Sequence, residues 1–354
     1  MANTPLRILK STRENWSENL SDQTIENHPI LTLLKSKSRI EYNCSGTDLK
    51  WTVEYKEAPL VPYADFDVLT FNRQDLLQTA TLDTRGYQAV DAISNKEMKQ
   101  NKGKFAIIKL FDGKAMRMKK TAGNRLCAKF YIDGNLAGNE KDIHGIESFT
   151  GITPGSQVAT DDEATVYNDT YAGLSTTKGA YGGAQGERHF DFWTPTVVNC
   201  NKTGTSWATD ADAFLRYAIT KHTRGQKADE RLDLIQLTRS AYVALCQILE
   251  SKERVVVNKE DVGIRKFGFK STLNFDGVDV TFDPDIPATD VNNDAVYGYG
   301  FTTEQMKLKS LDSELWESHD LFDIDQLAFK WTVGFTGNLV FESPRHFVKF
   351  AAIS

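Results

Sequence analysis

The sequence predicts an α+β protein, and three observations lead to this prediction. Apolar and polar residues alternate strictly over 49–55 and again over 327–335, which is the period of a half-buried strand. A long stretch from 95 to 133 instead repeats its apolar residues every three or four positions, which is helical spacing. Residues 206–315 mix both patterns. With 354 residues, 40% of them hydrophobic, the chain is long enough for two sizeable domains.

Residues 1–38 are polar and contain only short apolar clusters, such as the one from Ile30 to Leu34. Such a segment cannot bury enough apolar surface to form a domain of its own. We expect an N-terminal arm that orders against a neighbouring subunit.

Residues 39–90 predict a long two-stranded ribbon with an irregular tip. Alternation is clean from Leu49 to Tyr55, is interrupted by prolines, and returns with Ala80, Leu82 and Val90 on one parity. A two-stranded ribbon is marginal in water, so we expect it to lie on another subunit. The predicted inter-subunit contacts are Lys50, Trp51, Lys56, Pro59 and Pro62.

Residues 91–205 begin with a predicted long helix over 95–133, about 58 Å long at 1.5 Å per residue. Ser94 and Glu97 form a capping box at its start, and Gly134 is predicted to be a left-handed stop. The apolar stripe consists of Phe105, Ile108, Phe111, Ala115, Met118, Ala122, Leu126 and Phe130.

The opposite face of this helix is strongly basic. From Lys96 to Lys129 there are eleven Lys or Arg and two acids, a local balance of +9 in a chain whose net charge is −6. A solvated helix face and a surface that lies along a polyanion both fit this pattern. The residues predicted for the basic face are Lys96, Lys99, Lys102, Lys109, Lys114, Arg117, Lys120 and Arg125.

Residues 206–315 predict an α/β unit. A helix starts near Thr209, a buried strand covers 232–237, and a second helix covers 240–250. Two strands then flank a hairpin turn at Asp276-Gly277. Residues 316–354 return to apolar strands, with a predicted turn at Gly337-Asn338, and should pair with earlier segments.

The motifs of common enzymes and metal sites are missing. The sequence has no HExxH, GxSxG, CxxC or P-loop pattern, so we expect no catalytic residues, no metal site and no cofactor. The four cysteines are dispersed, which is typical of reduced thiols in a cytoplasmic product. Neither a membrane helix nor a signal peptide is predicted. An acidic segment contains Asp283, Asp285, Asp290 and Asp294. These carboxylates could hold a divalent cation, but they lack the EF-hand spacing, so a solvated loop is the expected structure.

The order of these features resembles the major capsid proteins of tailed bacteriophages, which have the Hong Kong 97 fold. Four local matches carry the resemblance: NRLCAKFYIDGN with HGIESF, LIQLTRSAYVALCQILES, FDGVDVTFDPDIP with VYGYGFTTEQMKLK, and GNLVFESPR. The resemblance implies an extended loop at 39–90, the spine helix in a peripheral domain, an axial domain at 206–315, and peripheral return strands at 316–354.

The resemblance also implies a function and partners. Subunits would assemble through pentamers and hexamers into an icosahedral shell, in the host cytoplasm, and the virion would enclose double-stranded DNA against the basic face. Some relatives carry a long N-terminal scaffolding segment before the ribbon. Because the ribbon here begins near residue 40, a separate scaffolding protein is expected instead, together with a portal and decoration proteins. Some relatives crosslink a ribbon Lys to an Asn with help from a Glu. The residue types available here are Lys50, Lys56, Asn338 and Glu342.

Two alternatives remain open. One is an encapsulin-like cellular compartment of the same fold, which would enclose a cargo protein instead of DNA. The other is a cytoplasmic hydrolase or transferase built on residues 206–315, which would leave the ribbon and the basic helix unexplained.

Overall fold

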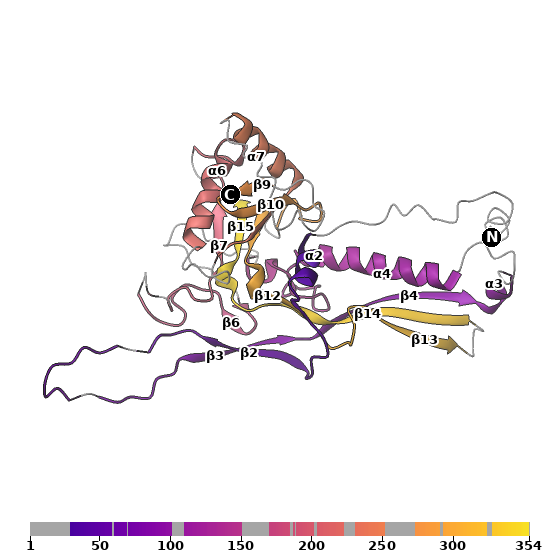
Figure 1. Ribbon diagram of the computed structural model, residues 1–354, viewed down its shortest axis with the longest axis horizontal. Helices are drawn as coiled ribbons and strands as arrows, with labels where there is room; N and C mark the ends of the chain where they lie inside the picture. The colour runs from indigo at the N-terminus through magenta and orange to yellow at the C-terminus, as the bar shows by residue number, and fades with distance from the viewer. Residues whose placement is uncertain are drawn as a thin grey trace.

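The computed structural model describes residues 29–58, 60–68, 70–100, 110–150, 170–184, 187, 189–201, 204–222, 231–251, 273–290, 293–323 and 328–353. These residues form two main sheets, a helix that lies along the longer sheet, and a ribbon that projects away from the body (Figure 1). The mixture of helices with mostly antiparallel sheets confirms the predicted α+β class.

The longer sheet is built around β14 (Ala328–Phe341). One edge of this strand pairs antiparallel with β4 (Arg85–Ser94), and the other edge pairs with β13 (Glu317–Asp323) and then with β12 (Met306–Ser310). A short parallel strand, β1 (Ile40–Glu41), adds to β12. The C-terminal part of β14 is buried in the main core, so this strand connects the core to the outlying end of the sheet.

The second sheet has six strands, and two helices pack on it through a separate apolar core. Its strands, in spatial order, are β7 (Thr196–Asn199), β15 (Val348–Ala352), β11 (Ala295–Phe301), β8 (Leu234–Leu237), β10 (Val278–Phe282) and β9 (Leu273–Phe275). The helices are α6 (Trp207–His222) and α7 (Arg239–Ser251). The predicted turn between β9 and β10 is confirmed, since Asp276 and Gly277 have φ of 49° and 85°, the pattern of a type I′ hairpin.

Several shorter elements complete the structure, and most of them contribute side chains to the main apolar core. They are α2 (Pro29–Ser36), α5 (Glu147–Thr150), β5 (Thr170–Tyr171), β6 (Leu174–Ser175) and the 3-10 turns η3 (Thr303–Gln305) and η4 (Pro344–His346). All four residues of α5 are buried, including Glu147.

The spine is described in two parts, α3 (Asn95–Gln100) and α4 (Leu110–Lys129), and residues 101–109 lie outside the described ranges. At the start, the amide of Glu97 donates to the hydroxyl of Ser94 at 3.2 Å, as the predicted cap requires. The helix ends at Lys129 instead of Asp133. Gly134 is absent from the left-handed region, so the predicted glycine stop is wrong. A Cβ at Gly134 would meet His144 Nδ1 at 2.9 Å, so close packing explains this glycine.

The predicted turn at Gly337-Asn338 is also wrong, because β14 runs straight through it. A Cβ at Gly337 would lie 2.0 Å from the carbonyl oxygen of Lys309 on the neighbouring strand. Asn338 is buried and hydrogen-bonds inside the chain. Both residues therefore serve strand packing, although their types favour turns.

Sheet membership crosses the predicted segment boundaries. The six-stranded sheet takes β7 and β15 from outside residues 206–315, while β12, inside that range, pairs in the longer sheet. Both return strands pair with earlier segments, as predicted, but they do so in different sheets. The division of the chain into five segments remains a prediction.

Candidate assembly and polyanion-binding surfaces

The ribbon is a pair of antiparallel strands, β2 (Asp48–Glu54) and β3 (Leu77–Asp83), whose inner face is part of the core. Leu49 is paired with Leu82 and Trp51 with Ala80, in the register that the alternation predicts. Leu49, Ala80 and Leu82 are all buried. The base of the ribbon is therefore held by its own chain.

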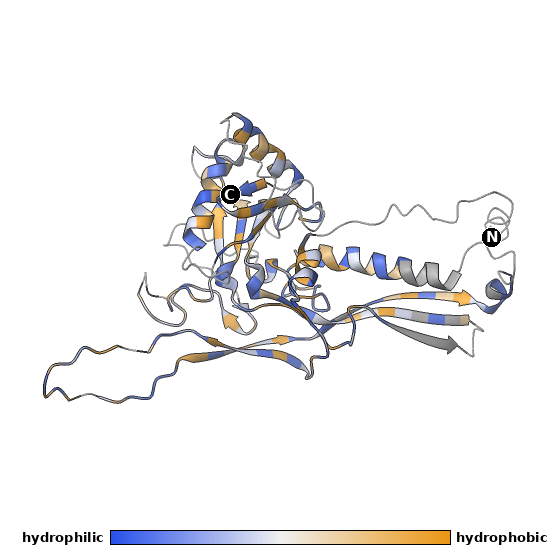
Figure 2. Cartoon of the chain, viewed as in Figure 1, coloured by the Kyte–Doolittle hydropathy of each residue, from blue (hydrophilic) through white to orange (hydrophobic). Residues whose placement is uncertain are grey.

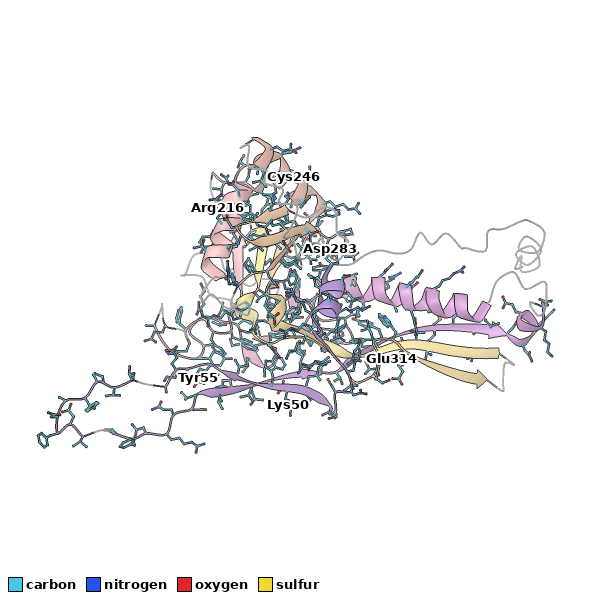
Figure 3. All side chains as sticks on the ribbon, in the orientation of Figure 1. Lys50, Tyr55, Arg216, Cys246, Asp283 and Glu314 are labelled. Carbon is cyan, nitrogen blue, oxygen red and sulfur yellow. The ribbon has the colours of Figure 1, made fainter. Side chains whose placement is uncertain are left out.

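Aromatic contacts extend this attachment along the ribbon. The indole of Trp51 donates a hydrogen bond to the carbonyl of Glu342 at 3.1 Å and lies 6.5 Å from the Trp193 ring. Tyr55 contacts Phe192 and Tyr181, with ring centroids 5.7 and 6.0 Å away. Figure 3 labels Lys50 and Tyr55 on this part of the ribbon.

Beyond Tyr55 the ribbon loses regular structure and extends away from the body, at the lower left of Figure 1. Its tip carries a set of exposed large apolar and aromatic side chains, and the trace there contains several orange segments in Figure 2. These tip residues are Leu60, Val61, Tyr63, Phe66, Val68 and Phe71, and four of them are at least 91% exposed. Large apolar side chains exposed together are typical of an interaction site.

The residues predicted as inter-subunit contacts differ in how exposed they are. Lys50 is exposed and faces Asp48 at 3.9 Å, and Pro62 is exposed on the tip. Trp51 is half-buried and donates its indole N–H within its own chain, and its inter-subunit contact remains a prediction. Lys56 is half-buried, and Pro59 lies outside the described residues. The apolar tip side chains were missed, because they do not alternate and the prolines suggested only an irregular loop.

A cluster of polar side chains fixes the junction where the ribbon meets the longer sheet. The guanidinium of Arg85 donates to the carbonyls of Gly134 and Asn139, at 2.9 and 3.1 Å, and to that of Asp142. Its Nε also pairs with Asp83 at 2.9 Å. One side chain thus ties the first residue of β4 to the segment that follows α4.

Asn338 and His144 complete this junction. The Asn338 amide donates to the carbonyl of Asp83 at 2.8 Å and accepts from the backbone amide of His144 at 2.9 Å. Asn338 is fully buried, so the structure does not support it as a crosslinking residue at the subunit surface. Glu342 is engaged as well, since it pairs with Lys307 at 2.8 Å.

Burial sets the protonation of this cluster. Desolvation, helped by the nearby Arg85 charge, lowers the pKa of His144 to about 4, although Asp83 lies 3.2 Å from its Nε2. Burial would raise the pKa of Asp83, but hydrogen bonds and charge from Arg85 and His144 outweigh it and lower this pKa. The junction therefore contains a neutral imidazole at neutral pH.

The spine helix packs one face on the longer sheet and exposes cations elsewhere. Met118 is buried against Ile93 and Val333, while Leu126 and Phe130 enter the main core. These contacts confirm the C-terminal part of the predicted apolar stripe.

Four members of the predicted basic face are exposed, and its contact with DNA remains a prediction. Its exposed members are Lys96, Lys99, Arg117 and Arg125. Lys120 is half-buried, Lys102 and Lys109 lie outside the described residues, and the side chain of Lys114 is likewise not described. Lys129 is paired with Asp142 at 2.8 Å, so it contributes less to the surface charge.

A shallow hollow of about 360 Å³ lies between α4 and β4. It is lined by Ala89, Val90, Asp91, Arg117, Met118 and Thr121. Val90 is 73% exposed here, so its predicted place on the buried parity of the ribbon is wrong. The hollow combines apolar and charged groups and opens to the surface.

The acidic segment is not the solvated loop that the sequence suggested. Asp283 is buried and accepts a hydrogen bond from the Tyr131 hydroxyl at 2.8 Å. Asp290 accepts from Lys349 at 3.0 Å, and Asp294 is buried too. Across the described ranges, no group of three His, Cys, Asp or Glu side chains is placed to hold a metal ion.

None of the described helices combines the length and apolar character that spanning a membrane requires. The remaining candidates for a functional site are three surfaces: the apolar tip of the ribbon, the basic face of the helix, and the hollow beside this helix.

Comparisons with known proteins were made by sequence and by structure. No family model matches the sequence, and a search of curated proteins finds no relative. Solved structures do match over almost the full length. A capsid subunit of cyanophage A-1(L) aligns with a TM-score of 0.67 at 14% identity, covering 96% of this chain and 97% of that one.

Two further structures show the same architecture. The capsid of a native GTA particle matches with a TM-score of 0.58 at 11% identity, covering 96% of this chain and 95% of that one. An encapsulin complex from Synechococcus elongatus matches with a TM-score of 0.54 at 8% identity, covering 100% and 96%. The predicted resemblance is thus confirmed at the level of structure: this chain has the fold of the shell-forming capsid proteins of phages.

Proposed function

We propose that this chain is the major capsid protein of a tailed bacteriophage. It would assemble through pentamers and hexamers into an icosahedral shell that encloses double-stranded DNA, and would be located in the virion. The observation that carries the proposal is the full-length match to the cyanophage capsid subunit, at a TM-score of 0.67. Its role would be structural, with its function in its interfaces.

The apolar tip of the ribbon supports assembly with further copies of the chain. Phe66, Val68 and Phe71 are 102%, 93% and 91% exposed, so the chain itself offers them no burial. Burying such side chains on a neighbouring copy removes apolar area from water, which favours association by roughly 25 cal/mol per Å². In a closed shell the same contact would be repeated between many copies, so the stabilisation from each contact would add up over the whole shell.

The exposed cations of α3 and α4 support contact with packaged DNA. Arg117 and Arg125 are exposed on α4, in a chain whose net charge is −6. A positive surface on an acidic protein suits a polyanion that is met on one side only. Such phosphate contacts are independent of base sequence and weaken with salt.

Other partners belong to the same proposal. A separate scaffolding protein would guide assembly in the host cytoplasm, and a portal and decoration proteins would complete the particle. Co-expression of the chain with candidate scaffolds, followed by imaging, tests whether closed shells need such a protein.

The assembly step is tested by Phe71→Asp with Asn72→Asp as its matched control. Both variants add one negative charge to adjacent exposed positions of the tip. We expect Phe71→Asp to abolish capsomers and shells in sizing chromatography and negative-stain images, while Asn72→Asp assembles. Circular dichroism should show both variants folded, because exposed sites contribute little to stability. Normal shells from Phe71→Asp would contradict a role for the tip.

The DNA contact is tested by the double variant Arg117→Glu/Arg125→Glu, with Lys141→Glu as an exposed control outside α4. Binding of duplex DNA to assembled particles or capsomers should weaken, and should depend less steeply on salt, only in the double variant. Equal losses in both variants would indicate a general charge effect and would contradict the assignment to α4.

A second candidate is a cellular compartment shell, because the encapsulin complex also matches over the full length of this chain. The two functions differ in what the shell would enclose. Shells purified from cells would carry absorbance from nucleic acid in the first case, and a stoichiometric cargo protein in the second.

A further inference from the structure

A fully buried lysine lies against two carboxylates where the six-stranded sheet meets α5. Lys349 on β15 has no exposed side-chain surface, and the side chains of Asp290 and Glu147 are 1% and 5% exposed. The Lys349 Nζ lies 3.0 Å from Asp290 Oδ2 and 2.9 Å from the Glu147 carboxylate. The hydroxyl of Tyr299 also donates to Glu147.

This arrangement is costly as a set of ions. Two carboxylates and one ammonium carry a net charge of −1, and a buried charge is stable only when partners compensate for its lost hydration. Burial alone would lower the pKa of Lys349, but Glu147 and Asp290 outweigh it and raise this pKa. The lysine is therefore held as an ammonium. It contacts the Asp290 carboxylate, which could react with it, and the Glu147 carboxylate, which could carry its protons.

We propose that Lys349 and Asp290 condense to an intramolecular amide, with Glu147 as the proton relay. Glu147 takes a proton from the Lys349 ammonium, and the freed amine attacks the Asp290 carboxyl carbon. The C–N bond forms while the bond from this carbon to one carboxyl oxygen breaks. That oxygen leaves as water with two protons of the original ammonium, one of them delivered by Glu147. No oxidant or co-reactant is needed.

The product removes two opposite charges from the buried site. The new amide keeps one N–H, which can donate to the Glu147 carboxylate, and Glu147 keeps its hydrogen bond from Tyr299. The bond would join β15 to the segment before β11 (Ala295–Phe301), two parts of the sheet that are already adjacent through the β11–β15 pairing. Positioned groups in a site without water react faster than free ones, since their orientation is already fixed.

A pair elsewhere in the chain provides the matched control. Lys307 lies 2.8 Å from Glu342 and 3.2 Å from Glu41, so it too faces two carboxylates. The Lys307 side chain is 23% exposed and that of Glu342 is 29% exposed, so water solvates these ions. We expect no condensation there.

The test is the intact mass of the denatured full chain. We expect a mass below the sequence mass by one water, and the deficit should persist in Lys307→Arg. Lys349→Arg, Asp290→Ala and Glu147→Gln should each restore the full mass. The unchanged sequence mass in the natural chain would overturn the proposal.

Peptide mapping locates the bond without any variant. Trypsin should release residues 271–307 and 346–354 as one branched peptide, uncleaved after Lys349 and lighter than the two parts by one water. Separate peptides, or a deficit placed in any other peptide, would refute the proposal even if the variants fail to fold.

Discussion

The base and the tip of the ribbon have similar apolar content but opposite environments. At the base, Leu49 is 5% exposed and paired with Leu82 over the core, whereas Leu60 on the tip is 97% exposed. The base is stabilised by contacts within its own chain, whereas the tip side chains remain exposed. The comparison shows that one continuous segment divides its apolar side chains between the core of the chain and its exposed surface.

The largest effect should come from shortening a side chain at the base. Leu49→Ala should lower the free energy of unfolding by about 4 kcal/mol, because it leaves a cavity in the core. Leu60→Ala makes the same change on the tip and should alter stability by less than about 0.5 kcal/mol. Denaturant unfolding measures both. Equal losses would show that the tip is also packed within its own chain.

Acid should weaken the junction at the base of the ribbon. His144 binds a proton with a pKa of about 4 in the folded chain and near 6.5 when unfolded, so its contribution is complete above pH 6.5. As the pH falls to 4, the unfolded state binds the proton first, and stability should decrease by about 3 kcal/mol.

His144→Gln provides the control for this pH dependence. The variant should lose the slope between pH 6.5 and 4 in unfolding experiments, whatever its stability at pH 7. Because the pKa of Asp83 is lowered in the folded chain, the stability of the His144→Gln variant should still decrease at lower pH. A slope that persists unchanged in the variant would assign it to other groups.

A smaller effect is expected where the base ends. Trp51→Phe keeps an aromatic ring beside Trp193 but removes the N–H that donates to the Glu342 carbonyl. Loss of one such hydrogen bond should cost about 1 kcal/mol in thermal or denaturant unfolding. Tyr55→Phe, on the same face of the ribbon, keeps the ring contacts with Tyr181 and Phe192 and should cost less.

The smallest effect belongs to Lys50. Its pair with Asp48 is long, at 3.9 Å, and the lysine side chain is 60% exposed, so Lys50→Ala should change stability by less than about 0.5 kcal/mol. A measurable loss of assembly in sizing chromatography, with unchanged stability, would support Lys50 as an inter-subunit contact. Unchanged assembly would remove it from that set.

The sequence predicts well wherever one periodicity decides the structure. Alternation places Leu49, Ala80 and Leu82 inside, and helical spacing places Met118 and Leu126 on the packed face. The prediction fails at Val90 because the chain changes sheets at Thr84. Ile93 is the buried residue of β4, so the inward parity reverses between β3 and β4. No local sequence pattern indicates that the chain passes from one sheet to another.

Other failures come from contacts between distant residues. Gly337-Asn338 has the composition of a turn, but the approach of Lys309 and the hydrogen bond to Asp83 keep it in a strand. Lys349 stands in an apolar run, and only the fold brings Glu147 and Asp290 to it. The apolar tip was missed for the opposite reason, because exposure follows from the absence of tertiary packing in the chain itself.

The change of sheet at Thr84 has a mechanical consequence. A pull on the ribbon tip passes along β3 and through one residue into β4, which is held to β14 by ten registered pairs. Because the pull is directed along the strands, these pairs are loaded together in shear and cannot open one at a time. A force applied to one ribbon would therefore be spread over the whole length of the longer sheet.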